Sequence, residues 1–298
     1  MISFIMMAKN EKDRIKYAID GILESGFEDF ELIVIDDHSE DDTYNIVKSY
    51  AAVDKRIKLY KNKYIGKVEG TNYGYELSSG DLVKCIDADD ILDSQFFDCL
   101  QDIMPGCSHC HAANIVSNNL DYIAKYNVNH GIVDLNFEEV TSRLVSLPKW
   151  CWTFSREVAD KIFPLPSDMP IEDIWMSIRA KQYSEKILVT DKPLYLYRQH
   201  KGQDYGGILN YGFDVVELRA WRSIKTIQLL ELMNEYSYID FSYLKNYLNL
   251  CVSRASLKAI LFSDLVLRDK AKLVLILHFP SAASVFTKIK WWFDGRCQ

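Results

Sequence analysis

Two stretches of the chain, Phe30-Glu-Leu-Ile-Val-Ile-Asp-Asp-His-Ser39 and Leu82-Val-Lys-Cys-Ile-Asp-Ala-Asp-Asp90, decide the fold. Each begins as a short apolar run and ends in a cluster of acidic residues. An apolar run of this length is typical of a buried strand. In open α/β sheets the carboxyl ends of neighbouring strands face one crevice, where ligands bind. We therefore expect the two acidic clusters to lie together in one crevice.

Carboxylates gathered in one crevice need a positive partner, because like charges at close range disfavour each other's ionised form. The acidic residues concerned are Asp36 and Asp37 after the first run, and Asp87, Asp89 and Asp90 after the second. Oxygen ligands prefer hard cations such as Mg²⁺ or Mn²⁺. The sequence therefore predicts a metal-bound site for a phosphate-bearing ligand, with Mn²⁺ or Mg²⁺ as the cofactor.

The first hundred residues alternate strand and helix patterns. Apolar periodicity and turn residues place strands at 2–7, 31–35, 56–60 and 81–86, and helices at 12–25, 42–50 and 68–78. This alternation predicts right-handed crossovers and an α/β fold with a mostly parallel sheet flanked by helices.

The rest of the chain divides into two further parts. Residues 106–208, with short strands, a helix near 137–145 and several prolines, are expected to build the second wall of the cleft against residues 1–105. Residues 209–298 form a helical C-terminal region, because no glycine occurs between residue 212 and Gly295. Helices are predicted there at 211–236 and 240–262, with a shorter third one.

Composition excludes several classes of protein. The 298 residues carry a net charge of −7, which argues against nucleic acid as the main partner. The hydrophobic fraction of 48% is typical of a globular protein. The absence of a signal-peptide pattern and of a long apolar run, together with an odd number of cysteines, indicates a cytoplasmic protein.

Two segments allow two interpretations each. Cys107-Ser-His-Cys-His111 could bind zinc, but the sequence offers no second ligand pair at a matching distance, so buried thiols are favoured. The stretch 284–293 places apolar side chains on one helical face with Lys288 and Lys290 beside them. It could lie on the inner face of a membrane or pack on the protein itself.

The turn after the first strand excludes a common nucleotide site. It reads Ala8-Lys-Asn-Glu-Lys12 and lacks the Gly-x-Gly-x-x-Gly pattern of dinucleotide-binding proteins. The chain has no Gly-x-x-x-x-Gly-Lys-Ser/Thr loop either. A nicotinamide enzyme is therefore disfavoured, and a cation is expected to neutralise the phosphates.

Several motifs in a fixed order resemble the inverting family 2 glycosyltransferases of GT-A fold. They are Asn10-Glu11, Phe30–Ser39 followed by Asp42-Thr43, Asn72-Tyr-Gly74, Ser79-Gly80-Asp81, and the Asp-x-Asp element within Ile86–Asp90. The resemblance covers about the first hundred residues. It implies that residues 1–105 bind a nucleotide-sugar donor and that residues 106–208 form the acceptor side of the same catalytic domain.

The resemblance also implies roles for individual donor-side residues. Asp89 would bind the cation that bridges the diphosphate, and Asp87 would hold the ribose or a metal-bound water. Lys67 would supply a phosphate contact where the family often has an arginine, at Thr71. The residues implied to contact or support the nucleotide sugar are Asn10, Glu11, Asp36, Asp37, Lys67, Asn72, Asp87, Asp90 and Arg198.

On the acceptor side, Glu172-Asp173 resembles the family's Glu-Asp motif. Asp173 is expected to act as the general base, with Glu172 as the alternative, although acidic residues also simply favour helix starts. His200, in Leu194-Tyr-Leu-Tyr-Arg-Gln-His200, would join Asp87 and Asp89 at the metal. The acceptor sugar would contact residues of Lys149-Trp150-Cys-Trp152, whose rings could equally belong to the core.

These features together predict the function. We expect metal-dependent, inverting transfer of a single hexose-type sugar from a UDP-sugar to a hydroxyl of a saccharide or lipid-linked glycan, in the synthesis of a surface polysaccharide such as a capsule or O-antigen. Two alternatives are a sugar nucleotidyltransferase and a non-catalytic sugar-binding or scaffold subunit. The first normally has a glycine- and lysine/arginine-rich loop after strand one, which this sequence lacks.

Overall fold

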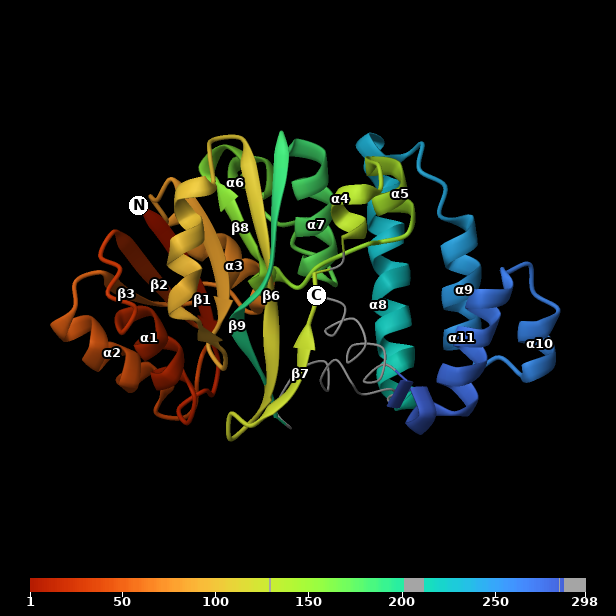
Figure 1. Cartoon of the computed structure of the whole chain (residues 1–298), viewed down its shortest axis with the longest axis horizontal. Helices are drawn as coiled ribbons and strands as arrows, with labels where there is room; N and C mark the ends of the chain where they lie inside the picture. Colours follow the sequence, from red (N-terminus) through yellow and green to blue (C-terminus); the bar gives the residue numbers. More distant parts are fainter. Residues whose placement is uncertain (129, 201–211, 284, 287–298) are drawn as a thin grey trace.

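A computed structural model of the protein describes residues 1–128, 130–200, 212–283 and 285–286. Nine strands form one mixed sheet with helices on its faces, and the C-terminal helices lie beside it (Figure 1). The strand order is β3-β2-β1-β4-β8-β6-β9-β5, and β7 pairs with β6. The sheet therefore runs without interruption from the first segment into the second.

The first four strands are parallel, as the alternation predicted. They are β1 (Ile2–Ala8), β2 (Phe30–Asp36), β3 (Ile57–Lys61) and β4 (Leu82–Asp87). Within this register Ala8 lies beside Asp36, and Met7 lies beside Asp87. The prediction that both acidic clusters meet at one edge of the sheet is confirmed.

Three helices connect these strands, close to the predicted positions. They are α1 (Ile15–Leu23), α2 (Thr43–Val53) and α3 (Lys67–Glu76). α1 begins later than expected, because residues 11–14 form a turn in which the Arg14 amide donates to the Glu11 carbonyl over 2.9 Å. The Glu11 amide in turn donates to the Thr43 hydroxyl over 2.7 Å, so this turn is fixed against the start of α2.

The second segment extends the sheet with antiparallel and parallel pairings. β8 (Trp152–Ser155) pairs antiparallel with both β4 and β6, and so joins the two segments. β6 and β9 run parallel. Besides β8, the elements here are β5 (Ile91–Leu92), η1 (Ser94–Asp102), β6 (Cys107–Ser117), β7 (Tyr122–Tyr126), α4 (Gly131–Asp134), α5 (Phe137–Ser142), η2 (Lys149–Cys151), α6 (Arg156–Ile162), α7 (Glu172–Tyr183) and β9 (Lys186–Gln199). The sheet is thus parallel through its first four strands and mixed beyond them.

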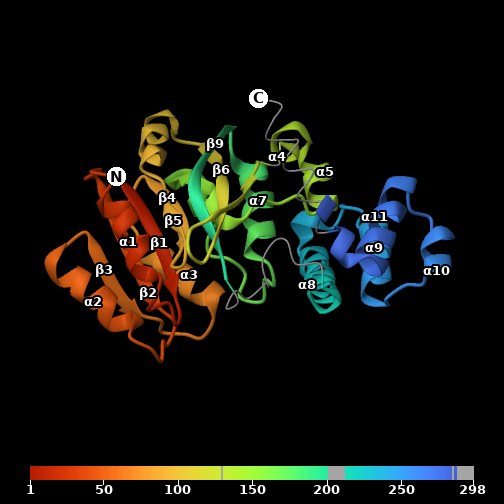
Figure 2. The same ribbon diagram turned by 60° about the horizontal axis from the view of Figure 1, so that its bottom comes forward.

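The C-terminal helices lie on the α7 side of the sheet, and only the first of them stands next to α7 (Figure 2). They are α8 (Phe213–Leu232), the short η3 (Asn234–Tyr236), α9 (Ser242–Val252), α10 (Leu257–Leu261) and α11 (Leu267–His278). Arg179 on α7 binds Glu235 over 2.8 Å and so fixes this region to the part of the chain that forms the sheet. The single helix predicted at 240–262 is wrong. The chain breaks at Arg254, whose φ is +50°, and Ser256 caps a new helix through the Ala259 amide.

The amphipathic stretch predicted at 284–293 lies outside the described residues, apart from the exposed Val285 and Phe286. Among the described helices, none is both long enough and apolar enough to cross a membrane. Membrane contact by residues 284–293 therefore stays a prediction.

A buried carboxylate ties three of the parallel strands together. Glu31 of β2, 3% exposed, accepts the Ser3 hydroxyl of β1 and the Ser79 amide before β4, each over 2.6 Å. Lys58 of β3 donates to its other oxygen over 2.6 Å. Burial opposes ionisation, but these donors together lower the pKa of Glu31 to about 2. A lowered carboxyl pKa means that the charged form stabilises the fold.

Replacing this carboxylate should weaken the sheet. We expect Glu31→Gln to reduce the free energy of unfolding at pH 7 by about 2–3 kcal/mol. Because the folded pKa lies below the ordinary value of 4.5, the contribution is complete above pH 4.5 and is lost as the pH falls towards 2. Urea unfolding at pH 7 and pH 3 measures this, with the exposed Glu28→Gln as the control. An equal loss at both pH values would contradict the assignment.

Candidate active site

Two adjoining pockets open at the carboxyl edge of the parallel strands. One, of about 640 Å³, is lined by the turns after β1, β2 and β4 together with Tyr197 and His200. The other, of about 670 Å³, lies between the η2 segment, the start of α7 and one side of α8. Lys67, Asp87 and Tyr197 line both. We call them the first and the second pocket.

The turns after β1 and β2 are held to each other by side chains. Asn10 has a φ of +57°. Its side-chain oxygen accepts a hydrogen bond from the Glu40 backbone amide over 2.8 Å, and its backbone amide donates to the Ser39 hydroxyl. Asp37 lines the first pocket, and one of its oxygens accepts from Asn62 over 2.7 Å. Asp36 is buried and accepts the Ser39 amide. Asp36 therefore shapes the turn, as expected, while Asn10 and Asp37 border the pocket.

A cluster suited to a cation lies in the first pocket. One ligand atom from each of Glu11, Asp89 and His200 lies within 4.8 Å of the others. The His200 Nε2 is 2.9 Å from an Asp89 oxygen. Two carboxylates and one imidazole suit Mn²⁺ or Mg²⁺, with the imidazole favouring Mn²⁺. The donor set therefore fits the metal that the sequence predicted at Asp89 and His200.

Asp87 differs from the expectation, because in the described structure it does not belong to this cluster. Residues 88 and 89 form a turn that separates the two carboxylates of the Asp-x-Asp motif. Asp87 instead lies 3.0 Å from the ammonium of Lys149 and 3.6 Å from that of Lys67. Burial opposes ionisation of Asp87, but the two lysines lower its pKa to about 2. Glu11, which was expected to contact the nucleotide sugar, lies in the cluster in the position expected for Asp87.

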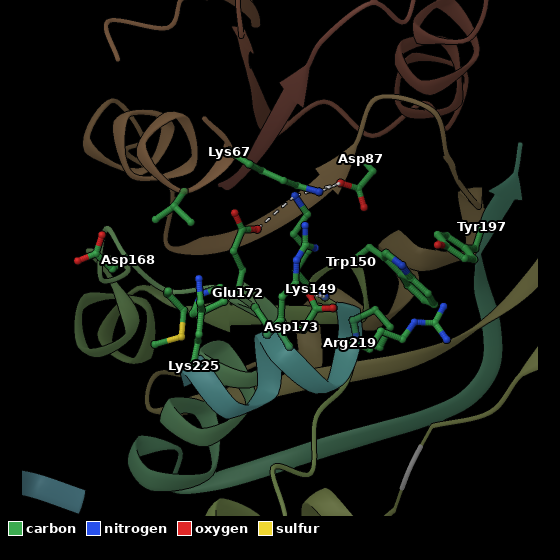
Figure 3. A pocket seen from close by; sticks show the side chains of 16 residues that line it. Lys67, Asp87, Lys149, Trp150, Asp168, Glu172, Asp173, Tyr197, Arg219 and Lys225 are labelled. Carbon is green, nitrogen blue, oxygen red and sulfur yellow. Dashed lines mark hydrogen bonds and ion pairs between the residues drawn. The ribbon is translucent and has the colours of Figure 1, made fainter. Parts of the chain in front are cut away.

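Lys149 connects the two pockets. Its side chain is 4% exposed, and its ammonium lies 3.0 Å from Asp87 and 3.7 Å from Glu172 (Figure 3). Burial opposes a charged lysine, but Asp87 and Glu172 raise the pKa of Lys149 above its ordinary value. One buried cation therefore neutralises two carboxylates from opposite sides of the cleft. Sequence reasoning had placed Lys149 only near an acceptor sugar.

Glu172 and Asp173 begin α7 and line the second pocket, as predicted. One Asp173 oxygen accepts the Lys149 amide over 2.9 Å. Burial raises the pKa of Asp173 to about 6, above its ordinary value of 3.8. Glu172 Oε1 has no hydrogen-bond partner within the described part of the chain. Asp173 therefore has the environment of a proton acceptor that works near neutral pH.

Three residues that were predicted to contact or support the donor lie behind the pockets rather than in them. Asp90 is buried and accepts the Arg198 amide over 2.7 Å, so it supports the turn that carries Asp89. The Arg198 guanidinium lies over the Tyr17 ring of α1 at 5.1 Å, and Arg198 lines neither pocket. The side-chain amide of Asn72 donates to the Leu165 carbonyl and accepts a hydrogen bond from the Leu165 backbone amide. Asn72 therefore joins α3 to the second segment.

The two tryptophans expected at the acceptor differ in position. Trp152 is completely buried in β8, and its indole donates to Ser177, so of the two interpretations core packing holds for this residue. Trp150 is 2% exposed and stacks on Tyr195 with ring centroids 5.0 Å apart, yet it also borders the second pocket. β8 lies inside the sheet between β4 and β6 and all four of its residues are buried, so Trp152 belongs to the core.

The cysteine and histidine motif lies in the core of β6. Cys107 and Cys110 are buried, as favoured over a zinc site. His111 Nε2 is 2.9 Å from the ammonium of the buried Lys84. Within the described residues, the only group of metal-ligating side chains close enough to hold an ion is the one at Glu11.

Comparison with known proteins identifies the family. Residues 3–163 match the model of glycosyl transferase family 2, which is more than half of the chain. The chain belongs to this family. Its fold is of the GT-A type, as the sequence resemblance implied.

Solved structures of two relatives share the fold of this family 2 protein. S. aureus TarS 1–349 in complex with UDP-GlcNAc has a TM-score of 0.57 at 18% identity, covering 95% of this chain and 88% of that one. The mannosyltransferase PcManGT from Pyrobaculum calidifontis, in complex with GDP-Man and Mn²⁺, has a TM-score of 0.58 at 15% identity, covering 95% and 86%.

One curated relative is more similar in sequence over a shorter region. The GalNAc(5)-diNAcBac-PP-undecaprenol beta-1,3-glucosyltransferase of Campylobacter jejuni is 36% identical over 93 residues, which is 30% of this chain. The match covers only 30% of that relative's length. The shared part is therefore limited to a fraction of each protein.

Removing one carboxylate from the cluster should weaken cation binding. We expect Asp89→Asn to reduce Mn²⁺ affinity in the presence of UDP by at least about tenfold, because a charged oxygen ligand is lost. Electron paramagnetic resonance of free Mn²⁺ measures this. Asp98→Asn, which removes an exposed carboxylate on η1, is the matched control. Unchanged Mn²⁺ affinity in Asp89→Asn would show that the cluster is not the cation site.

Proposed function

We propose that this family 2 protein is a metal-dependent, inverting glycosyltransferase that moves one sugar from a UDP-sugar to a hydroxyl of a saccharide or lipid-linked glycan. The observation that carries the proposal is the arrangement of the two pockets. A cation cluster lies in one and a buried carboxylate of raised pKa in the other, and the pockets meet at Lys67, Asp87 and Tyr197. Such a junction suits a sugar passing from donor to acceptor.

The first pocket is the donor site in this proposal. Asp37 and Asn10 border the region for the nucleoside, and Glu11, Asp89 and His200 would hold the cation. The bound cation would stabilise the negative charge that develops on the departing diphosphate. Lys67, on the junction, would contact the diphosphate or the sugar. The structures in complex with UDP-GlcNAc and with GDP-Man and Mn²⁺ support this use of the fold by relatives.

The second pocket is the acceptor site. Asp173 would accept the proton of the acceptor hydroxyl as that oxygen attacks the anomeric carbon, while the bond to the diphosphate breaks. A single displacement of this kind inverts the anomeric configuration. Lys149 holds Asp173 through its backbone amide and Glu172 through its ammonium. Its buried charge also keeps Asp87 ionised at the junction.

The named relative supports the proposed class of acceptor. The C. jejuni protein is named as a glucosyltransferase acting on a glycan linked through diphosphate to undecaprenol. We propose the same broad class of process, synthesis of a polysaccharide or lipid-linked glycan, for the present chain. If this proposal holds, the protein acts at the inner face of a membrane that carries such acceptors.

A donor screen tests the proposed activity. With Mn²⁺ and a panel of UDP-sugars, we expect slow release of UDP by transfer to water with at least one donor, and none without a divalent cation. Coupled detection of UDP measures the release. Binding of UDP-sugars without any release, with all donors, would favour a sugar-binding or scaffold subunit. Release of diphosphate from a nucleoside triphosphate would favour a nucleotidyltransferase.

The pH dependence tests the base. Because burial raises the pKa of Asp173 to about 6, its proton-accepting form is present above pH 6 and is lost below it. Turnover of the parent should therefore fall about tenfold per pH unit below pH 6 and level off above. Asp173→Asn should lower turnover by ~10²-fold or more and leave UDP binding with Mn²⁺ nearly unchanged.

Glu172→Gln is the matched variant for this test. If Asp173→Asn keeps parental turnover while Glu172→Gln loses it, Glu172 is the base instead. Measuring UDP binding over the same pH range separates the titration of the base from that of the cation ligands.

A further inference from the structure

Lys84 is a buried lysine that the proposed reaction does not use. It belongs to β4 and is completely buried. Its ammonium donates to the Trp150 carbonyl over 2.6 Å and to the Trp152 carbonyl over 3.3 Å. A third contact, of 2.9 Å, joins it to Nε2 of His111 on β6. These three contacts tie the chain at 150–152 to β4 from inside the core.

The three neighbours match the three N–H groups of an ammonium. His111 Nδ1 lies 2.9 Å from the Ala112 carbonyl, which can only accept, so Nδ1 carries the proton and Nε2 is an acceptor. Burial lowers the pKa of His111 well below 6.5, which keeps its ring neutral. Burial also lowers the pKa of Lys84, to about 7. Below pH 7, Lys84 is therefore an ammonium with one acceptor for each proton.

The side chain of Lys84 takes over where the pairing of β4 with β8 gives way to η2. The two strands pair antiparallel at residues 82–83 and 154–155. Residues 149–151 then form a short 3-10 helix instead of a strand. The two carbonyls that Lys84 binds belong to this turn and to the first residue of β8. Lys84 therefore extends the attachment of this segment to β4 beyond the paired residues.

The same turn carries Lys149 into the cleft. Its ammonium lies 3.0 Å from Asp87 and 3.7 Å from Glu172, and its amide donates to Asp173 over 2.9 Å. The first carbonyl that Lys84 binds belongs to the residue that follows Lys149. Two residues of β4 thus hold the turn, Lys84 within the core and Asp87 at the end of the strand. The position of both polar groups of Lys149 depends on this double attachment.

Core packing alone does not account for a lysine at this place in β4. Taking an ammonium out of water is costly, and an apolar side chain of similar size would fill the same space without that cost. The neighbouring Val83 and Cys85 are buried without any charge. A buried polar group can specify one arrangement of the chain among several that pack equally well. The arrangement that Lys84 specifies is that of the turn beside the second pocket.

We propose that Lys84 is a positioning residue of the active site. It fixes η2 so that the Lys149 amide reaches Asp173 and the Lys149 ammonium neutralises the two carboxylates across the cleft. The inference rests on the proposed function, because it takes Asp173 as the base. Lys84 is completely buried and lines neither pocket, so it acts through Lys149 and not on a substrate.

The titration of Asp173 reports the position of Lys149. Burial and the neighbouring Glu172 raise the pKa of Asp173, to about 6, while the Lys149 amide and the charges of Lys67 and Lys149 oppose this rise. We expect Lys84→Met, which removes the ammonium, to raise the pKa of Asp173 further, by about half a unit or more. Carbon-13 NMR of protein labelled at the aspartate carboxyl groups measures it. The Asp173 resonance is identified by its loss in Asp173→Asn.

Turnover should change together with this pKa. In the UDP-release assay we expect Lys84→Met to lower turnover at pH 7 by at least about tenfold, because a displaced turn misplaces the base. The fall of turnover at low pH should begin at a higher pH than in the parent. Affinity for UDP with Mn²⁺ should stay nearly unchanged, since Lys84 lines no part of the first pocket.

The matched control is Val83→Ala, which opens a cavity at the adjacent and equally buried position of β4. It should reduce stability and leave turnover and the pKa of Asp173 at their parental values. A parental pKa of Asp173 in folded Lys84→Met, or an equal shift in Val83→Ala, would overturn the proposal. A shifted pKa with parental turnover would overturn it too, because Asp173 would then not be the base.

A second variant covers the case in which Lys84→Met does not fold. The same measurements are then made on Lys84→Gln, whose uncharged and shorter side chain offers two N–H groups in place of three. The same direction of change in pKa and turnover is expected. Failure of both variants to fold would assign Lys84 to the stability of the core and overturn the proposal.

Failure of this proposal is separable from failure of the proposed function, because the NMR titration needs no activity. If the parent releases UDP from a UDP-sugar but the pKa of Asp173 does not respond to Lys84→Met, the positioning inference alone is wrong. If that pKa responds but the parent releases no UDP with any donor, the proposed function is wrong, and the hold of Lys84 on Lys149 stands.

Discussion

The buried ammonium of Lys149 is the interaction on which the arrangement of the site depends. It lies between Asp87, at the end of β4, and Glu172, at the start of α7, and its backbone amide holds Asp173. Removing a buried cation would leave two desolvated carboxylates facing each other, which is costly. This charge therefore allows the two segments of the chain to approach closely where the two pockets meet.

Charge is distributed differently in the two pockets. In the first, the carboxylates of Glu11 and Asp89 lie beside His200, a donor set that suits a cation. In the second, lysine and arginine side chains surround Asp173, whose pKa is raised by burial. Under the proposed function, such a division would allow a metal and a general base to work a short distance apart, because the lysines at the junction reduce the repulsion between the carboxylates.

Sequence reasoning was most successful where one local rule determines position. The parallel pairing of β1, β2 and β4 follows from their alternation with helices, and it brings Asp36, Asp37 and Asp89 to one edge of the sheet. It was less successful for side chains whose direction depends on distant packing. Asn72 follows a donor motif in sequence, yet it bridges to Leu165. Trp152 follows Trp150, which borders the second pocket, by only two positions, yet it is buried in the core.

The sequence by itself determined the family, the parallel character of the first strands and the acidic residues of the cleft, because these depend on short motifs and on strand periodicity. Only the tertiary structure decided that Glu11 joins Asp89 and His200, that Lys149 bridges the two walls, and that α8 supplies cations to the second pocket. These residues meet through contacts between segments up to about two hundred positions apart, and no local pattern encodes contacts of that range.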